Sequence, residues 1–192
     1  MAEPLSGRAG VPATHGRGER VTGDEVPPRG SVRGSVERAV REALLTGRFV
    51  PGRAVTLRGL AQELGVRPMP VREAVRALSA GNALDIRPNG RIQVPTMTRP
   101  RLEEILKARL LLEPELAGLA APGLNRADAA GLAEIDDRID ASLDGGDAET
   151  YMRLNHAFHF RIYRAAGSQV LLPLVETLWL QFAPFMRTVY GR

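Results

Sequence analysis

The chain has 192 residues, no cysteine and 44% hydrophobic residues. This length accommodates one or two domains, and the lack of cysteine excludes disulfides and cysteine-rich zinc sites. No apolar run approaches the roughly 20 residues of a membrane span and no signal peptide is recognisable, so we expect a cytoplasmic protein without membrane contact. Residues 1–100 hold 16 arginines and no lysine and carry a net charge of +7, whereas residues 101–192 carry −3. This asymmetry fits a nucleic-acid-binding domain joined to a domain with another task.

Residues 1–30 are rich in Gly, Pro, Arg and Glu and show no apolar period. This composition predicts a disordered arm, because the segment has too little apolar surface to offset the entropy cost of ordering. A basic arm that follows DNA is the alternative, although the mixed charges of the segment favour it less.

Residues 57–94 contain two short helical patterns and a hairpin. Thr56 can cap the first helix, and Gly65 follows its last apolar residue, where a left-handed backbone is easiest for glycine. Pro70 suits the first turn of the second helix, because its missing N–H is not needed there. The second helix has a narrow apolar stripe made of Val71, Ala74, Val75 and Leu78.

On the face opposite this stripe, the second helix carries Arg72 and Arg76. Short strands are predicted at residues 83–87 and 91–94, joined by a Pro-Asn-Gly turn at residues 88–90. Two helices followed by such a hairpin form a winged helix-turn-helix, which places its second helix in the DNA major groove. Similar helix pairs also occur in proteins that never contact DNA, where the arginines are only solvated.

After a linker at residues 96–100, the rest of the chain is predicted to be helical, which makes the protein mainly α. The first helix of this half covers residues 101–121, where leucines and isoleucine recur at helical spacing. Three residues are suited to cap the helices that follow: Asn125, Asp147 and Ser168. Pro184 is expected to kink the last of these helices.

Residues 35–94 resemble the winged-helix domain of the GntR family of bacterial transcription regulators. The resemblance is carried by LTG at 45–47, FVPG at 49–52, LAQELGV at 60–66 and PVREAVRAL at 70–78. It implies DNA contacts at four positions: Arg58, Arg67, Arg72 and Gly90.

The physical roles of these positions follow from their chemistry. Arg72 can bond guanine in the major groove with both arms of its guanidinium, whereas Arg58 and Arg67 can serve phosphates or bases. Arg76 and Arg91 are further candidates for backbone contacts. The turn reads Arg-Pro-Met where the family often has Ser-Arg-Thr, so we expect Arg67 to substitute for the missing contact; the wing glycine also varies in position within the family.

The second half resembles the FCD ligand-binding domain of the FadR-type subfamily. The matching runs are KARLLLEPELA at 107–117 and NHAFHFRI at 155–162. The resemblance implies a cavity for a small organic acid, often a sugar acid, and Arg109 could hold its carboxylate. A surface salt bridge to Glu113, four residues on, is the alternative for Arg109. Weaker candidates of the same kind are Glu113, Tyr151 and Arg153.

Asn155 and His159 are four residues apart and share one helix face. The resemblance implies that they begin a zinc or nickel site, which two later histidines would complete. None of the chain's three histidines follows residue 159, so we expect only weak metal binding. The family domain also has two more helical segments than we can place, so we expect the second domain to be incomplete.

These features predict a homodimeric transcription regulator, in the first place a repressor, that binds operator DNA and responds to a small carboxylate effector. No nucleophile or acid–base constellation is recognisable, so we expect no enzyme. The alternative is a truncated, dimerising interaction protein that binds neither DNA nor effector. The expected organisation is an arm at 1–30, a winged-helix domain at 31–95, a linker at 96–100 and a partial effector-binding and dimerisation domain at 101–192.

Overall fold

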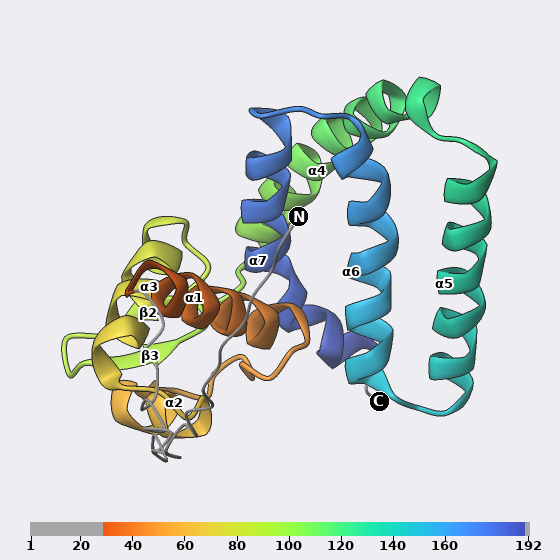
Figure 1. Cartoon of the computed structure of the whole chain (residues 1–192). Coiled ribbons are helices and arrows are strands. Elements are labelled where there is room, and N and C mark those ends of the chain that lie inside the picture. Colours follow the sequence, from red (N-terminus) through yellow and green to blue (C-terminus); the bar gives the residue numbers. More distant parts are fainter. Residues whose placement is uncertain (1–28, 191–192) are drawn as a thin grey trace, which may run out of the picture.

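The computed structural model describes residues 29–190, so the arm predicted at residues 1–30 falls almost entirely outside the described part. The elements follow in the order α1 (Arg29–Leu45), β1 (Val55–Thr56), α2 (Leu57–Glu63), α3 (Pro68–Ala80), β2 (Asp85–Ile86), β3 (Arg91–Gln93), α4 (Arg99–Ala120), η1 (Ala121–Gly123), α5 (Arg126–Asp144), α6 (Ala148–Ala165) and α7 (Leu171–Tyr190). Figure 1 shows α1 to β3 packed together on one side of the molecule and α4 to α7 on the other. We call these groups the winged-helix domain and the helical domain.

The winged-helix domain has a core that all its helices share. Helix α3 packs against both α1 and α2, and its predicted apolar stripe is fully buried. Leu44 of α1, Leu60 of α2 and Ile92 of β3 contribute to the same core. Each of these short elements has only one apolar side to bury, so they are stable only when packed on one another. The local signals also hold: Thr56 Oγ1 accepts from the Gly59 N–H at 3.0 Å, and Gly65 has a φ of +64°.

The wing belongs to a three-stranded antiparallel sheet in which β3 lies between β1 and β2. The sequence predicted a two-stranded hairpin with longer strands, at residues 83–87 and 91–94; the observed ladder is shorter and includes β1. That strand is missed because two residues are too few to show an alternating pattern. Its pairing of Val55 with Ile92 ties the wing to the start of α2.

In the helical domain, α4, α6 and α7 pack against one another, and α5 packs against α6 at the edge of the molecule (Figure 1). The buried centre contains Leu116, Phe160 and Trp179, one from each of the three inner helices. The predicted caps are confirmed: Asn125 forms a capping box, Asp147 accepts from the Thr150 N–H, and Ser168 Oγ accepts from the Leu171 N–H.

Helix α7 belongs to the helical domain and also completes the core of the other domain. Leu180 is buried in the winged-helix core, and Phe185 packs against that core. Pro184 lies inside the helix, where its ring and missing N–H interrupt the hydrogen-bond ladder, and Figure 1 shows α7 bending in its C-terminal part. The two domains are further joined by an ion pair of 2.7 Å between Arg48 and Glu149.

Candidate DNA-binding surface and ligand cavity

Helix α3 has the geometry of a recognition helix because one side is buried in the core and the other side carries exposed arginines. Pro68 lies in its first turn, where proline is tolerated, and Gly81 ends it. The buried stripe fixes the rotation of the helix about its own axis. Arg72 and Arg76 are therefore exposed, and neither side chain forms a hydrogen bond or ion pair with another described residue.

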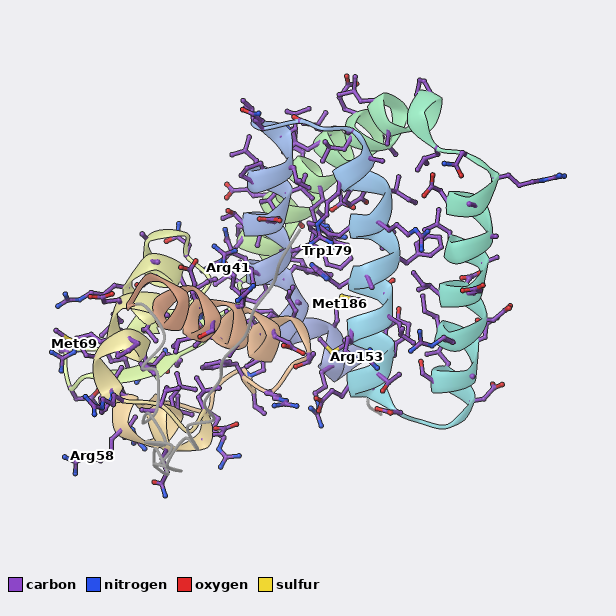
Figure 2. The ribbon with its side chains drawn as sticks, in the orientation of Figure 1. Arg41, Arg58, Met69, Arg153, Trp179 and Met186 are labelled. Carbon is purple, nitrogen blue, oxygen red and sulfur yellow. The ribbon has the colours of Figure 1, made fainter. Side chains whose placement is uncertain are left out.

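The remaining predicted contacts are also exposed, on the elements that flank α3. Arg58 extends from α2, Arg67 precedes α3, and Gly90 lies at the turn of the wing with a φ of +76°. Figure 2 shows Arg58 and Met69 at the outer edge of the winged-helix domain, away from the helical domain. A Cβ built on Gly90 would meet no atom within 4 Å, so this glycine is needed for its backbone conformation and not for internal space.

The helical domain has a cavity of about 490 Å³ between α4 and α6. Its polar wall consists of Arg109, Glu113, His159 and Tyr163. Its apolar wall consists of Leu106, Leu110, Pro114, Ala117, Phe158 and Ile162. The structure thus brings together three residues that the sequence singled out, Arg109, Glu113 and His159, and adds Tyr163.

Glu113 is the centre of the hydrogen bonds at this cavity. Its Oε1 accepts from Arg109 Nε and from Trp179 Nε1, the latter at 2.9 Å, and its Oε2 accepts from the Tyr163 hydroxyl at 2.8 Å. The salt bridge foreseen as an alternative for Arg109 is therefore present, although both side chains are largely shielded from solvent. Sequence reasoning missed Tyr163 and Trp179, which are 50 and 66 residues away from Glu113.

The Arg109 guanidinium contacts two aromatic rings and is bound along one edge by Glu113. Its central carbon lies 4.6 Å from the ring centroid of Trp179 and 4.9 Å from that of Phe182, both favourable cation–π distances. Glu113 occupies the edge formed by Nε and Nη2. Nη1 forms no hydrogen bond with the described residues, so Arg109, which lines the cavity, keeps donor capacity beyond its bonds to Glu113.

The titratable groups beside Glu113 are held in their neutral forms. Burial and then the hydrogen bond to Glu113 raise the pKa of the Tyr163 phenol, so its hydroxyl stays protonated and donates. Burial lowers the pKa of His159, an effect that the Glu113 carboxylate opposes. His159 Nδ1 lies 3.3 Å from the Tyr163 hydroxyl.

The residues present do not fit a complete metal site. Asn155 and His159 are both half-buried on α6, but only His159 lines the cavity. Between residues 29 and 190, no three side chains of the His, Cys, Asp or Glu type gather where they could hold an ion. Glu113, the carboxylate of the cavity wall, already accepts from three side chains.

Two weaker candidates lie away from the cavity. Tyr151 is buried in a separate cluster with Met152, Ala183 and Met186, and Arg153 is exposed. Neither is part of the cavity wall.

Among the residues of α6 and α7 that sequence reasoning overlooked, Tyr163 could have been found by its helical spacing from His159, whereas nothing in the sequence indicated Trp179.

Comparison with known proteins agrees with this architecture. Residues 33–94 match the model of the bacterial regulatory proteins of the gntR family, and residues 104–192 match that of the FCD domain. The chain is 31% identical over 155 residues to the HTH-type transcriptional regulator McbR of Escherichia coli K12, covering 81% of this chain and 70% of the relative. The chain belongs to the GntR family of bacterial transcription regulators.

Solved structures of this family support the same assignment. E. coli McbR/YncC superimposes with a TM-score of 0.77 at 30% identity, over 83% of this chain and 75% of that one. A putative GntR regulator from Rhodococcus sp. RHA1, with a TM-score of 0.63 at 23% identity over 82% of this chain and 75% of that chain, shares the fold. This GntR regulator thus has the predicted winged helix and FCD-type helical domain, and its relatives are regulators, not enzymes. None of its described helices has the length and apolar character needed to cross a membrane.

Proposed function

We propose that this GntR regulator is a cytoplasmic, homodimeric repressor whose binding to a pseudo-palindromic operator is controlled by a small organic acid. The observation that carries the DNA-binding half is the pair Arg72 and Arg76, exposed on α3 while the opposite side of that helix is buried. In a dimer, two such helices can enter successive major grooves about one helical turn apart.

Within this proposal, the exposed side chains have separate roles. Arg72 bonds guanine O6 and N7 through both arms of its guanidinium and so reads sequence. Arg58 and Arg67 bind phosphates or bases beside the groove, and the wing approaches the DNA backbone through Gly90, where no Cβ is in the way. These arginines are part of the net +7 of residues 1–100, which favours association with any DNA.

The effector half of the proposal rests on Arg109. Its guanidinium offers N–H groups in the fork geometry that matches a carboxylate. The aromatic rings of Trp179 and Phe182 hold the guanidinium plane in place, so little side-chain entropy is lost when an acid binds. The cavity of about 490 Å³ is within the usual size range for small-molecule sites.

The alternative function is a dimerising interaction protein, and a DNA-binding experiment distinguishes it from a transcription regulator. The test is fluorescence anisotropy with a duplex selected by the protein from a random pool, with excess nonspecific DNA present. A regulator keeps its selected duplex under this competition; recovery of no preferred sequence would favour the interaction protein.

Effector binding has an independent readout, because Trp179 is the only tryptophan of the chain and lies over Arg109. Gluconate and related acids should change its fluorescence in the wild type and not in Arg109→Gln. The change in DNA affinity at saturating acid then gives the direction of regulation. If no acid of the panel alters either signal, the organic-acid effector is wrong even where DNA binding persists.

Zinc and nickel are expected to bind weakly if they bind through Asn155 and His159, since two protein ligands leave an ion mostly hydrated. Calorimetry with each ion on the wild type and on His159→Ala tests this. Tight stoichiometric binding that survives His159→Ala would mean that the ligands lie elsewhere.

A further inference from the structure

The junction between the domains contains an arginine that bonds to both of them. Arg101 is half-buried in the first turn of α4, a few residues after the end of β3. Its Nη2 donates to the Asn82 carbonyl oxygen at 2.7 Å and to Gln181 Oε1 at 3.0 Å. Asn82 follows the recognition helix α3, and Gln181 belongs to α7. One nitrogen atom therefore links the end of α3 to the helical domain.

The Asn82 end of this link is structurally defined. Asn82 has a φ of +56°, the left-handed conformation that stops a helix, and its N–H donates to the Ser79 carbonyl at 3.0 Å. The carbonyls at a helix C-terminus lack partners within the helix and carry partial negative charge. The Asn82 carbonyl lies just beyond these groups, and a guanidinium this close to the helix end is favourable.

The Gln181 end is equally well defined by its neighbours along α7. Trp179, two residues earlier, donates to Glu113 at the ligand cavity, and Leu180 is buried in the winged-helix core. Thr177 lies one turn before, with its Cγ2 3.5 Å from the position of a Cβ built on Gly81. Residues 177–181, about one turn of α7, thus contact three parts of the molecule: Glu113 at the cavity, the winged-helix core and the end of α3.

We infer that Arg101 is a positioning residue for DNA recognition: it holds the C-terminal end of α3 at a fixed place against α7 through Asn82 and Gln181. It sets the direction of the recognition helix and does not read DNA itself. This part of the inference rests on the effector control proposed above: when a bound acid displaces Trp179, Gln181 on the same turn moves with it and changes the position of α3. A plain phosphate contact by Arg101 is the competing explanation.

Gln181→Leu is the sharpest variant, because it removes the anchor on α7 without changing any charge. Arg101→Met removes the link itself, and Arg99→Met is the matched control. Arg99 is exposed on the same helix turn and, among the described residues, pairs only with Glu103. We expect Gln181→Leu and Arg101→Met each to weaken operator binding about three- to tenfold, the range for the net loss of one ordinary hydrogen bond. The double variant should lose no more than Arg101→Met alone.

The dependence of affinity on salt distinguishes positioning from phosphate contact. A phosphate contact contributes about −0.9 to the slope of log affinity against log salt, so its loss makes the slope shallower by that amount. We expect the wild-type slope in both variants. A shallower slope in Arg101→Met together with wild-type affinity in Gln181→Leu would overturn the inference.

Amide hydrogen exchange without DNA tests the same link independently of the proposed function. Gln181→Leu should speed exchange at residues 81–84 by several-fold and leave the amides of α2 unchanged. Unchanged protection at residues 81–84 would refute the positioning role whether or not the chain binds an operator. Absence of DNA binding by the wild type, with faster exchange in the variant, would contradict only the proposed function.

Discussion

The two domains use arginine in opposite ways. In the winged-helix domain, Arg58, Arg67 and Arg72 extend into solvent without partners among the described residues. In the helical domain, Arg109 is largely buried against two aromatic rings and a carboxylate. The first arrangement leaves the guanidinium groups able to reach phosphates and base edges along a DNA groove. The second suits one small acid, because its receptor group is already oriented.

The largest expected effect on the free energy of unfolding comes from truncating Trp179, which packs against Arg109. Trp179 is 2% exposed, packs against Phe160 and covers Arg109. Trp179→Ala should lower the free energy of unfolding by about 3–5 kcal/mol, the range for an aromatic residue truncated in a core. Urea unfolding followed by circular dichroism measures it, with Trp179→Phe as the milder comparison. A loss below about 1 kcal/mol would mean that the helical domain does not depend on this packing.

A smaller effect is expected when only the carboxylate is altered. Glu113→Gln leaves Arg109 without its ionic partner and replaces an acceptor by an amide that cannot serve three donors. We expect about 2–3 kcal/mol of destabilisation, less than for a fully buried pair because both side chains keep some exposure. Glu115→Gln, exposed on the same helix, is the control and should be nearly neutral. Equal unfolding midpoints for the two variants would contradict the network described for Glu113.

Stability should also depend on pH through His156. Burial and the neighbouring Arg164 lower the pKa of His156 to about 4, from 6.5 in the unfolded chain. Between these values the unfolded state binds more protons, so the stabilising contribution is complete above pH 6.5 and is lost as the pH falls towards 4. Because one unit of pKa shift corresponds to about 1.4 kcal/mol, the loss should be on the order of 3 kcal/mol. It should be smaller in His156→Phe, which keeps an aromatic ring beside Phe160. Parallel pH profiles for the two proteins would argue against a buried neutral His156.

The smallest expected effect concerns the ion pair that joins the domains at their surface. Arg48 and Glu149 have side chains 57% and 41% exposed, so solvent screens their attraction. Arg48→Ala should therefore change the free energy of unfolding by about 0–1 kcal/mol. Thermal unfolding at low and high salt checks this. A loss well above that range would show that the domain junction depends on surface charge more than on Leu180.

The sequence predicted local features of the fold but not the contacts between distant segments. Signals within a few residues were reliable: the cap at Thr56, the capping box at Asn125 and the wing turn at Gly90 all occur. Contacts between distant segments were not predicted. Strand β1 pairs with a strand 36 residues later, and Leu180 completes the core of the other domain.

The candidate sites divide in the same way. The exposure of Arg72 and Arg76 could be predicted from the helix period, whereas Arg58 and Arg67 were chosen through the resemblance to the family. The surroundings of Arg109 could not be predicted, because Tyr163 and Trp179 come from α6 and α7 and no periodicity within α4 indicates which helix will face it.

The central claim is that α3 reads DNA sequence through Arg72. The most direct test compares wild type and Arg72→Ala on the selected operator and on scrambled duplex, over a series of salt concentrations. We expect the wild type to show a steep slope, about −0.9 per neutralised phosphate, and Arg72→Ala to lose about 1–3 kcal/mol on the operator alone, with relaxed preference at one base pair per half-site. An equal loss on both duplexes would assign Arg72 to phosphate, and a nearly flat salt response of the wild type would contradict DNA binding by this surface.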